Sequence, residues 1–108
     1  MLEVILGNKT AEKVLFYISV YGEGYAKKMA DTFEVSLNGI QMQLKRLEDG
    51  SVIVSQLKGK TRIYKFNPNY AFLKELKAIL IKAMGFLPEK TLNKYYRNRT
   101  RPRRKGKA

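Results

Sequence analysis

The architecture follows from one stretch, residues 25–50, which reads YAKKMADTFEVSLNGIQMQLKRLEDG. Apolar residues recur at helical spacing in its first third: Ala26, Met29, Ala30 and Phe33. A two-residue connection, residues 34–35, follows, and Ser36 is of a type that caps helix N-termini. The stretch therefore predicts a helix over residues 25–33, a tight turn, and a helix that begins at Ser36 and ends at Gly50.

Apolar stripes on this helix and on an earlier one predict a shared core. The expected inner face of the helix after Ser36 consists of Leu37, Ile40, Leu44 and Leu47. An earlier helix is predicted from the same spacing at Ala11, Val14, Leu15 and Ile18. Asn8 or Thr10 can cap this earlier helix, and residues 22–24, Gly-Glu-Gly, stop it.

The periodicity changes after Gly50. Residues 51–57 and 61–66 are rich in β-branched and aromatic side chains, and Lys-Gly-Lys at 58–60 separates them, which predicts a β-hairpin. A fourth helix is expected from about Asn69 to Gly85 or Leu87. It carries one apolar row for the core: Leu73, Leu76, Leu80, Ala83 and Leu87.

A second apolar row on the fourth helix consists of Phe72, Ile79 and Phe86. Because a monomer core needs only one such row, we expect the second to pack against another copy of the chain as a homodimer interface, with Tyr17 and Tyr21 joining it. The alternative is that this row is buried within the monomer.

The order helix, helix, tight turn, helix, hairpin, helix resembles a winged helix-turn-helix domain of the ArsR/MarR-like group of transcription regulators. The resemblance covers Asn8 to Leu87 and is carried by Ala30, Val35, Ser36, Ile40, Leu44, Leu47 and the Leu-Glu-Asp-Gly ending before the hairpin. It implies a mainly α fold with a small β-hairpin, in which the third helix enters the DNA major groove. Glu34 stands where such motifs often have glycine. Metal sensing in the group uses Cys and His ligands, which this chain lacks.

Composition excludes several classes of function. The chain has 108 residues and no cysteine or histidine, which rules out disulfides, zinc sites of the usual ligand types and nucleophilic catalysis with a histidine base. We therefore expect no enzyme activity, no metal and no cofactor. Twenty-two basic residues stand against nine acidic ones, a formal net charge of +13, which points to a polyanionic partner.

The charge excess is uneven. Residues 1–87 carry 13 basic and 8 acidic side chains, whereas residues 88–108 carry 9 basic and 1 acidic. We expect the first segment to be the DNA-binding domain and the second a disordered basic tail with a helical stub around Leu92, Tyr95 and Tyr96, since it has almost no apolar residue after Tyr96. The two tyrosines are expected to pack against the fourth helix.

Candidate DNA-binding residues fall into three groups. The outer face of the third helix offers side chains for base edges and phosphates: Ser36, Asn38, Gln41, Met42, Lys45 and Arg46. The hairpin tip offers Lys58, Lys60, Thr61 and Arg62. Backbone contacts are expected from Lys27 and Lys28 and from the tail arginines Arg97, Arg99, Arg101, Arg103 and Arg104.

These features predict a sequence-specific double-stranded-DNA-binding transcription regulator that acts as a homodimer. Two alternatives stay open: a basic module that binds RNA or ribonucleoprotein, and an architectural DNA-binding protein without strong sequence preference. No secretory signal or membrane-spanning stretch is evident, so we expect a soluble, cytoplasmic and nucleoid-associated protein without a membrane partner.

Overall fold

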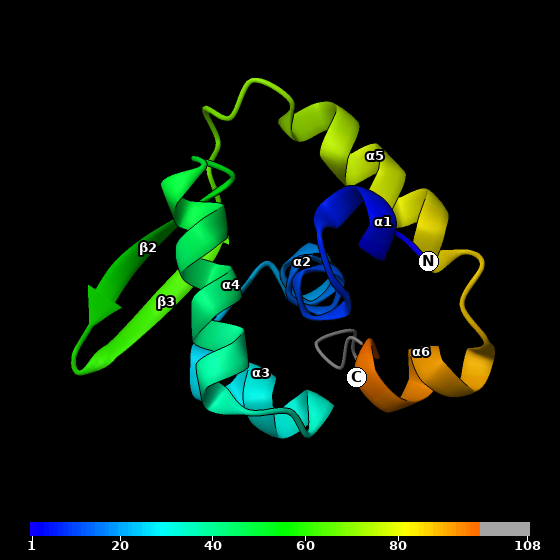
Figure 1. Cartoon of the computed structure of the whole chain (residues 1–108), viewed down its shortest axis with the longest axis horizontal. Coiled ribbons are helices and arrows are strands. Elements are labelled where there is room, and N and C mark those ends of the chain that lie inside the picture. Colours follow the sequence, from blue (N-terminus) through cyan, green and yellow to red (C-terminus); the bar gives the residue numbers. More distant parts are fainter. Residues whose placement is uncertain (98–108) are drawn as a thin grey trace, which may run out of the picture.

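The computed structural model describes residues 1–97, which form six helices and a small antiparallel sheet at one side of the molecule (Figure 1). The elements in chain order are α1 (Glu3–Leu6), α2 (Lys9–Tyr21), β1 (Glu23–Gly24), α3 (Ala26–Phe33), α4 (Leu37–Asp49), β2 (Ile53–Lys58), β3 (Thr61–Phe66), α5 (Leu73–Met84) and α6 (Glu89–Tyr95). The expected order of three helices, a hairpin and a further helix is confirmed by α2, α3, α4, β2–β3 and α5. The elements α1 and β1 are additions, and α6 confirms the helical stub expected around Leu92, Tyr95 and Tyr96.

Two side-chain caps fix the starts of the long helices. The Asn8 Oδ1 atom accepts a hydrogen bond from the backbone N–H of Ala11 at 2.8 Å, so Asn8 rather than Thr10 begins α2. The Ser36 Oγ atom accepts from the N–H of Gly39 at 3.0 Å and begins α4 as expected. Each cap satisfies a backbone donor that the first turn of a helix leaves without an intrahelical partner.

The helix α2 lies at the centre of the molecule, and Figure 1 looks almost straight down its axis with the other helices and the sheet around it. Its predicted face is buried, and so are Phe16 and Tyr17 outside that face. The single-stripe prediction for α2 is therefore too narrow, because neighbours cover this helix on several sides. Tyr17 is buried, so it is removed from contact with a second copy of the chain. The Tyr21 hydroxyl donates to the backbone oxygen of Tyr95 within the same chain.

The sheet has the strand order β1-β3-β2, with β3 antiparallel to both neighbours. The hairpin loop consists of Gly59 and Lys60 rather than the three residues expected, because Lys58 pairs with Thr61. Strand β1 was missed because two residues carry no alternating pattern. Its Gly24 is required by packing, since a Cβ there would lie 2.6 Å from Cε1 of Tyr17.

The helix α5 buries only part of its apolar surface. Leu80 and Ala83 are buried, whereas Phe72, Ile79 and Phe86 are 63%, 38% and 71% exposed. Burial of this second row within the monomer is therefore ruled out. The inner stripe of α4 needs one correction too, because Leu37 is 40% exposed while the other three stripe residues are buried.

The segment after Leu87 is more ordered than expected up to residue 97. Residues Glu89–Tyr95 form α6, and Tyr96 is only 8% exposed. The Tyr96 ring packs edge-on against Phe16 with ring centres 5.6 Å apart, and Phe33 lies 5.3 Å from the Tyr95 ring. The helical stub expected around Leu92, Tyr95 and Tyr96 is therefore confirmed and begins earlier, at Glu89, and the two tyrosine rings pack against Phe16 of α2 and Phe33 of α3, where the fourth helix was expected. The expectation for residues 98–108 lies outside the described residues.

Candidate nucleic-acid interface

A cleft of about 570 Å³ lies between the start of α3, the helix α4 and the β2–β3 hairpin, which we call the wing (residues 53–66). Its lining brings three separately predicted groups to one surface: Tyr25, Ala26, Lys27, Leu37, Gln41, Lys60, Thr61, Arg62 and Tyr64. Gln41 comes from α4, Lys27 from α3, and the remaining cations from the wing. The cleft thus combines an amide side chain with several positive charges.

The side chains predicted to read bases lie on the exposed surface of α4. Asn38, Gln41 and Met42 are all exposed, and the Asn38 amide nitrogen lies 3.6 Å from the sulfur of Met42. Ser36 is exposed as well, but its hydroxyl oxygen already caps α4. Of the base-reading candidates on α4, Gln41 is the one that lines the cleft.

Lys45 and Arg46, further along α4, are engaged within the protein. The Lys45 ammonium lies 2.9 Å from the Asp49 carboxylate, and this hydrogen bond raises the pKa of Lys45 above its ordinary value. The Arg46 guanidinium donates to the backbone oxygen of Leu6 at 2.6 Å and to the Gln43 side chain at 3.0 Å. Arg46 therefore connects α4 to the end of α1.

Arg62 on the wing is held by two consecutive hydrogen bonds, here called a relay, that the sequence did not predict. The Arg62 guanidinium donates to the Ser55 hydroxyl at 3.0 Å, and this hydroxyl donates to the Glu48 carboxylate of α4 at 2.6 Å. Burial, followed by the nearby Glu48 charge, raises the pKa of Tyr64, while Arg62 opposes this shift. The antiparallel register could have indicated part of the relay, since Leu57 pairs with Arg62 and Ser55 with Tyr64 on one face.

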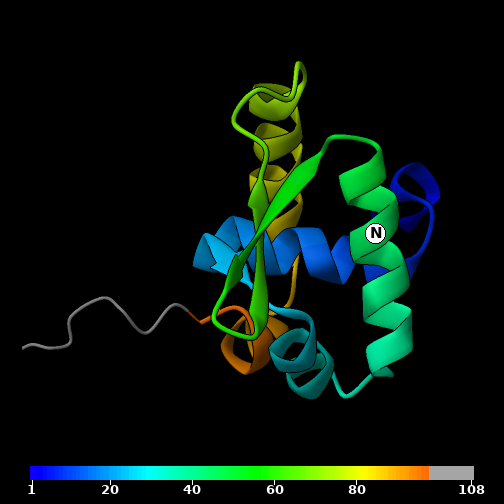
Figure 2. The same cartoon turned by 90° about the vertical axis from the view of Figure 1, so that its left-hand side faces the viewer.

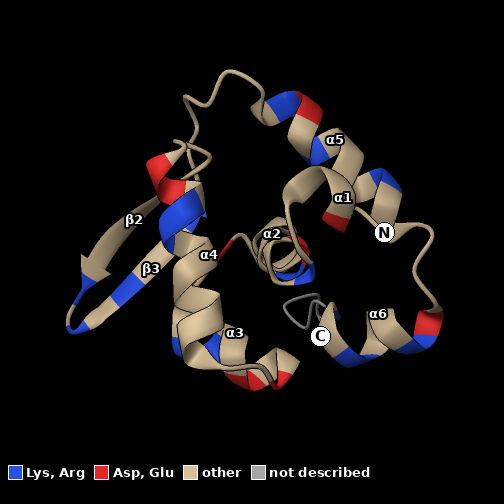
Figure 3. Ribbon diagram, viewed as in Figure 1, with Lys and Arg blue, Asp and Glu red and all other residues tan. Residues whose placement is uncertain are grey.

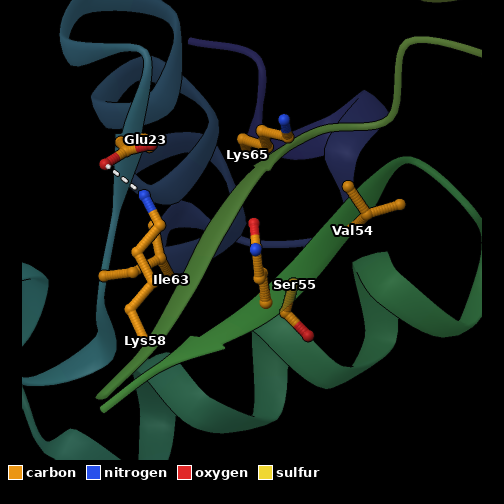
Figure 4. Close-up of a pocket in the computed structure, with 7 residues that line it drawn as sticks. Glu23, Val54, Ser55, Lys58, Ile63 and Lys65 are labelled. Atoms are coloured by element: carbon orange, nitrogen blue, oxygen red, sulfur yellow. Dashed lines mark ion pairs between the residues drawn. The ribbon is translucent and has the colours of Figure 1, made fainter.

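Lys58 lies on the opposite face of the sheet. Its ammonium is 3.9 Å from the Glu23 carboxylate of β1, across a pocket of about 310 Å³ that Ile63 and Lys65 also line (Figure 4). Lys60, Thr61 and Arg62 line the cleft but Lys58 does not, although it pairs directly with Thr61 in the hairpin. The predicted wing group therefore contributes three of its four residues to the cleft.

The remaining predicted cations lie on several elements. Figure 3 shows basic residues on α3, on α4 and at the wing tip, and acidic residues at the C-terminal end of α4. Lys27 pairs with Asp31 at 2.8 Å, and Lys28 is exposed. Arg97 is exposed after α6, whereas Arg99, Arg101, Arg103 and Arg104 lie outside the described residues. Residues 1–97 contain no cluster of acidic side chains that could hold a metal ion, and none of their helices is long and apolar enough to cross a membrane.

Two solved structures are similar to this chain in fold. YusO from Bacillus subtilis superimposes with a TM-score of 0.55 at 18% identity, over 80% of this chain and 67% of that one. The adhesin competence repressor AdcR from Streptococcus pyogenes gives a TM-score of 0.61 at 14% identity, over 87% of this chain and 68% of that one. No family model and no curated protein sequence matches the chain. The structural likeness establishes a mostly helical winged-helix fold with a small antiparallel sheet.

Proposed function

We propose that the chain is a transcription regulator that binds double-stranded DNA, with α4 in the major groove and the wing on the backbone or in the minor groove. The cleft carries this proposal, because Gln41 lines it together with one cation of α3 and two cations of the wing. In helix-turn-helix proteins the second helix of the motif, here α4, reads base edges. The likeness to AdcR, a repressor by its name, supports the same class of function.

We expect the side chains around the cleft to have different roles in DNA binding. The Gln41 amide can donate and accept at once, which matches N6 and N7 of adenine. Lys27, Lys60 and Arg62 line the same cleft as Gln41, and their positive charges suit phosphate oxygens. We therefore expect Gln41 to contribute to sequence preference and the three cations to contribute to affinity.

A second copy of the chain is the partner that we propose for α5. An apolar groove of about 450 Å³ runs between α1 and α5 and is lined by Met1, Leu2, Ile79, Lys82, Ala83 and Phe86. Beside it, Val4 and Ile5 of α1 are 90% and 70% exposed. Contiguous exposed apolar surface of this kind marks protein interfaces. A dimer would present two copies of α4 to half-sites about one DNA turn apart, which corresponds to a pseudo-palindromic target.

Selection from a random pool of duplex DNA, run beside a pool of structured RNA, tests the proposed function. We expect enrichment of a defined duplex motif. Gln41→Ala should then weaken binding to the selected duplex by about 1–3 kcal/mol and binding to a scrambled duplex far less. Gln56→Ala is the matched control, because Gln56 is equally an exposed glutamine but lies outside the cleft.

Three outcomes would contradict the proposal in different ways. Equal loss on both duplexes would remove Gln41 from base readout. Duplex binding without an enriched motif would favour the architectural alternative. Enrichment from the RNA pool alone would favour the RNA-binding alternative, to which the nine basic residues after Leu87 would then belong.

A further inference from the structure

The first residue of α4, Leu37, is apolar but does not belong to the core. It is 40% exposed, whereas Ile40 and Leu44 on the inner face of the same helix are fully buried. Leu37 instead lines the cleft together with Gln41, which lies one helical turn further along α4. In Figure 2 the first turn of α4 and the wing tip lie at the same, lower end of the view. Leu37 is therefore an exposed apolar side chain on the surface for which we propose contact with DNA.

A second pair of side chains on α4 repeats this combination. Asn38 and Met42 are both exposed and also lie one turn apart, with the Asn38 amide nitrogen 3.6 Å from the Met42 sulfur. Within residues 37–42, the exposed side chains are these two together with Leu37 and Gln41. The outer surface of the first half of α4 thus consists of two neighbouring rows, each with one amide and one apolar side chain.

Both kinds of side chain match the major-groove edge of an A·T base pair. An amide can bond to N6 and N7 of adenine at once. An apolar side chain can contact the 5-methyl group of thymine, which the other three bases lack. Guanine is read instead by arginine or lysine. The two rows therefore favour A·T over G·C base pairs.

The basic residues of α4 are bonded within the protein. They are Lys45 and Arg46, both in the second half of the helix. The Lys45 ammonium lies 2.9 Å from the Asp49 carboxylate, and Arg46 donates to the Leu6 backbone oxygen and to the Gln43 side chain. The N-terminal residues of a recognition helix are the ones that contact base edges. The part of α4 that meets the bases therefore carries no side chain of the type that reads guanine.

We propose that Leu37 and Met42 are specificity-determining residues that contact thymine 5-methyl groups, so that α4 reads A·T base pairs. The inference rests on the proposed function and names the base pairs that the same helix reads. Gln41 and Asn38, each one turn from an apolar partner, bond to the adenines. Removing one methyl group from water changes a dissociation constant about fourfold, which sets the size of each contact.

Replacement of thymine by uracil in the duplex tests this contact, because uracil keeps the base pair and lacks only the methyl group. Dissociation constants are measured by fluorescence anisotropy for the duplex recovered from the selection described above and for duplexes with one thymine replaced at a time. With the wild-type chain, at least one replacement should weaken binding about fourfold. In Leu37→Ala or in Met42→Ala, the ratio between the uracil and thymine duplexes at that position should fall to about one.

The ratio between the two duplexes separates recognition from folding, because a variant that folds less well loses affinity for both duplexes alike. Leu57→Ala is the matched control. Leu57 is 57% exposed but lies on the wing and does not line the cleft, so this variant should keep the ratio of about fourfold.

Loss of the thymine preference in Leu37→Ala or Met42→Ala supports the inference and assigns the methyl group to that side chain. The inference is overturned if no replacement weakens binding, if both variants keep the preference, or if Leu57→Ala abolishes it as well. A second selection with Gln41→Ala should relax the preference at A·T base pairs, and relaxation at G·C base pairs alone would also overturn it. Sequence-specific binding by the wild type leaves the proposed function intact in each of these cases. A wild-type chain that binds no duplex would overturn both.

Discussion

The helices α4 and α5 are nearly equal in length, at 13 and 12 residues, but present opposite chemistry to solvent. The helix α4 buries Ile40, Leu44 and Leu47 and exposes amide and charged side chains. The helix α5 buries Leu80 and Ala83 and leaves Ile79 and Ile81 exposed, with exposed Phe72 and Phe86 directly beside its two ends. These outer surfaces agree with the partners that we propose: duplex DNA for α4 and an apolar surface of a second copy for α5.

The largest expected effect tests the apolar surface of α5. Ile79→Glu combined with Phe86→Glu places two charges in the apolar groove. Each buried anchor of an interface contributes about 2–4 kcal/mol, so self-association at micromolar concentration should be abolished. Sedimentation velocity or light scattering measures this directly. Because both side chains are exposed in the single chain, the helical circular dichroism of the variant should remain.

Ala78→Glu is the matched control, since Ala78 is exposed on the same helix but outside the groove. It should leave self-association unchanged. A wild-type chain that is monomeric at these concentrations would contradict the proposed homodimer, and α5 would then need a different apolar partner.

A smaller effect is expected from the contact between α4 and the wing. Glu48 lies on α4 but accepts a hydrogen bond from Ser55, which in turn receives one from Arg62 of the wing. Ser55→Ala removes this relay and should weaken binding to the selected duplex by about 0.5–1.5 kcal/mol, the net value of a typical hydrogen bond. Fluorescence anisotropy measures the loss.

Combining Ser55→Ala with Arg62→Ala tests whether Ser55 affects DNA binding through Arg62. If Ser55 acts by positioning Arg62, its effect should disappear once Arg62 is absent. Losses that add without coupling would show that Ser55 contributes in another way, and α4 would then influence the wing only through packing.

The sequence predicted α4 well because its signals are local. A serine cap, a helical apolar stripe and a terminal glycine lie within fifteen residues, and only Leu37 of the stripe is exposed. The same local reasoning predicted α5 with two apolar rows, and the structure leaves one of them exposed.

The missed features depend on contacts between distant parts of the chain. Strand β1 exists through its pairing with β3, and the extent of α6 depends on the burial of Tyr96 on α2 and α3. The relay from Arg62 to Glu48 needs the side-chain positions of three elements. For the candidate site, the sequence named five of the nine residues that line the cleft, and it grouped Lys58 with them although Lys58 does not line it.

The smallest expected effect concerns the turn that sets the direction of α4. Glu34 adopts a left-handed conformation with φ +57° and ψ +46°, and the N–H of Val35 donates to the Ala30 oxygen at 3.1 Å across it. This is the geometry in which helices commonly end on glycine. A left-handed backbone costs a residue with a Cβ about 1–2 kcal/mol, whereas glycine loses about 0.5–1 kcal/mol more backbone entropy on folding.

Glu34→Gly should therefore raise the free energy of unfolding by about 0.5–1 kcal/mol, measured by urea denaturation. Glu34→Ala separates the backbone effect from the loss of the carboxylate, because alanine keeps the Cβ and should give no such gain. Equal stabilisation by both variants would assign the effect to charge in this basic protein rather than to backbone strain. The end of α5 offers no corresponding gain, since its cap residue Gly85 has φ −65° and needs no left-handed conformation. The left-handed residue thus lies in the turn between α3 and α4, the helix for which we propose entry into the major groove.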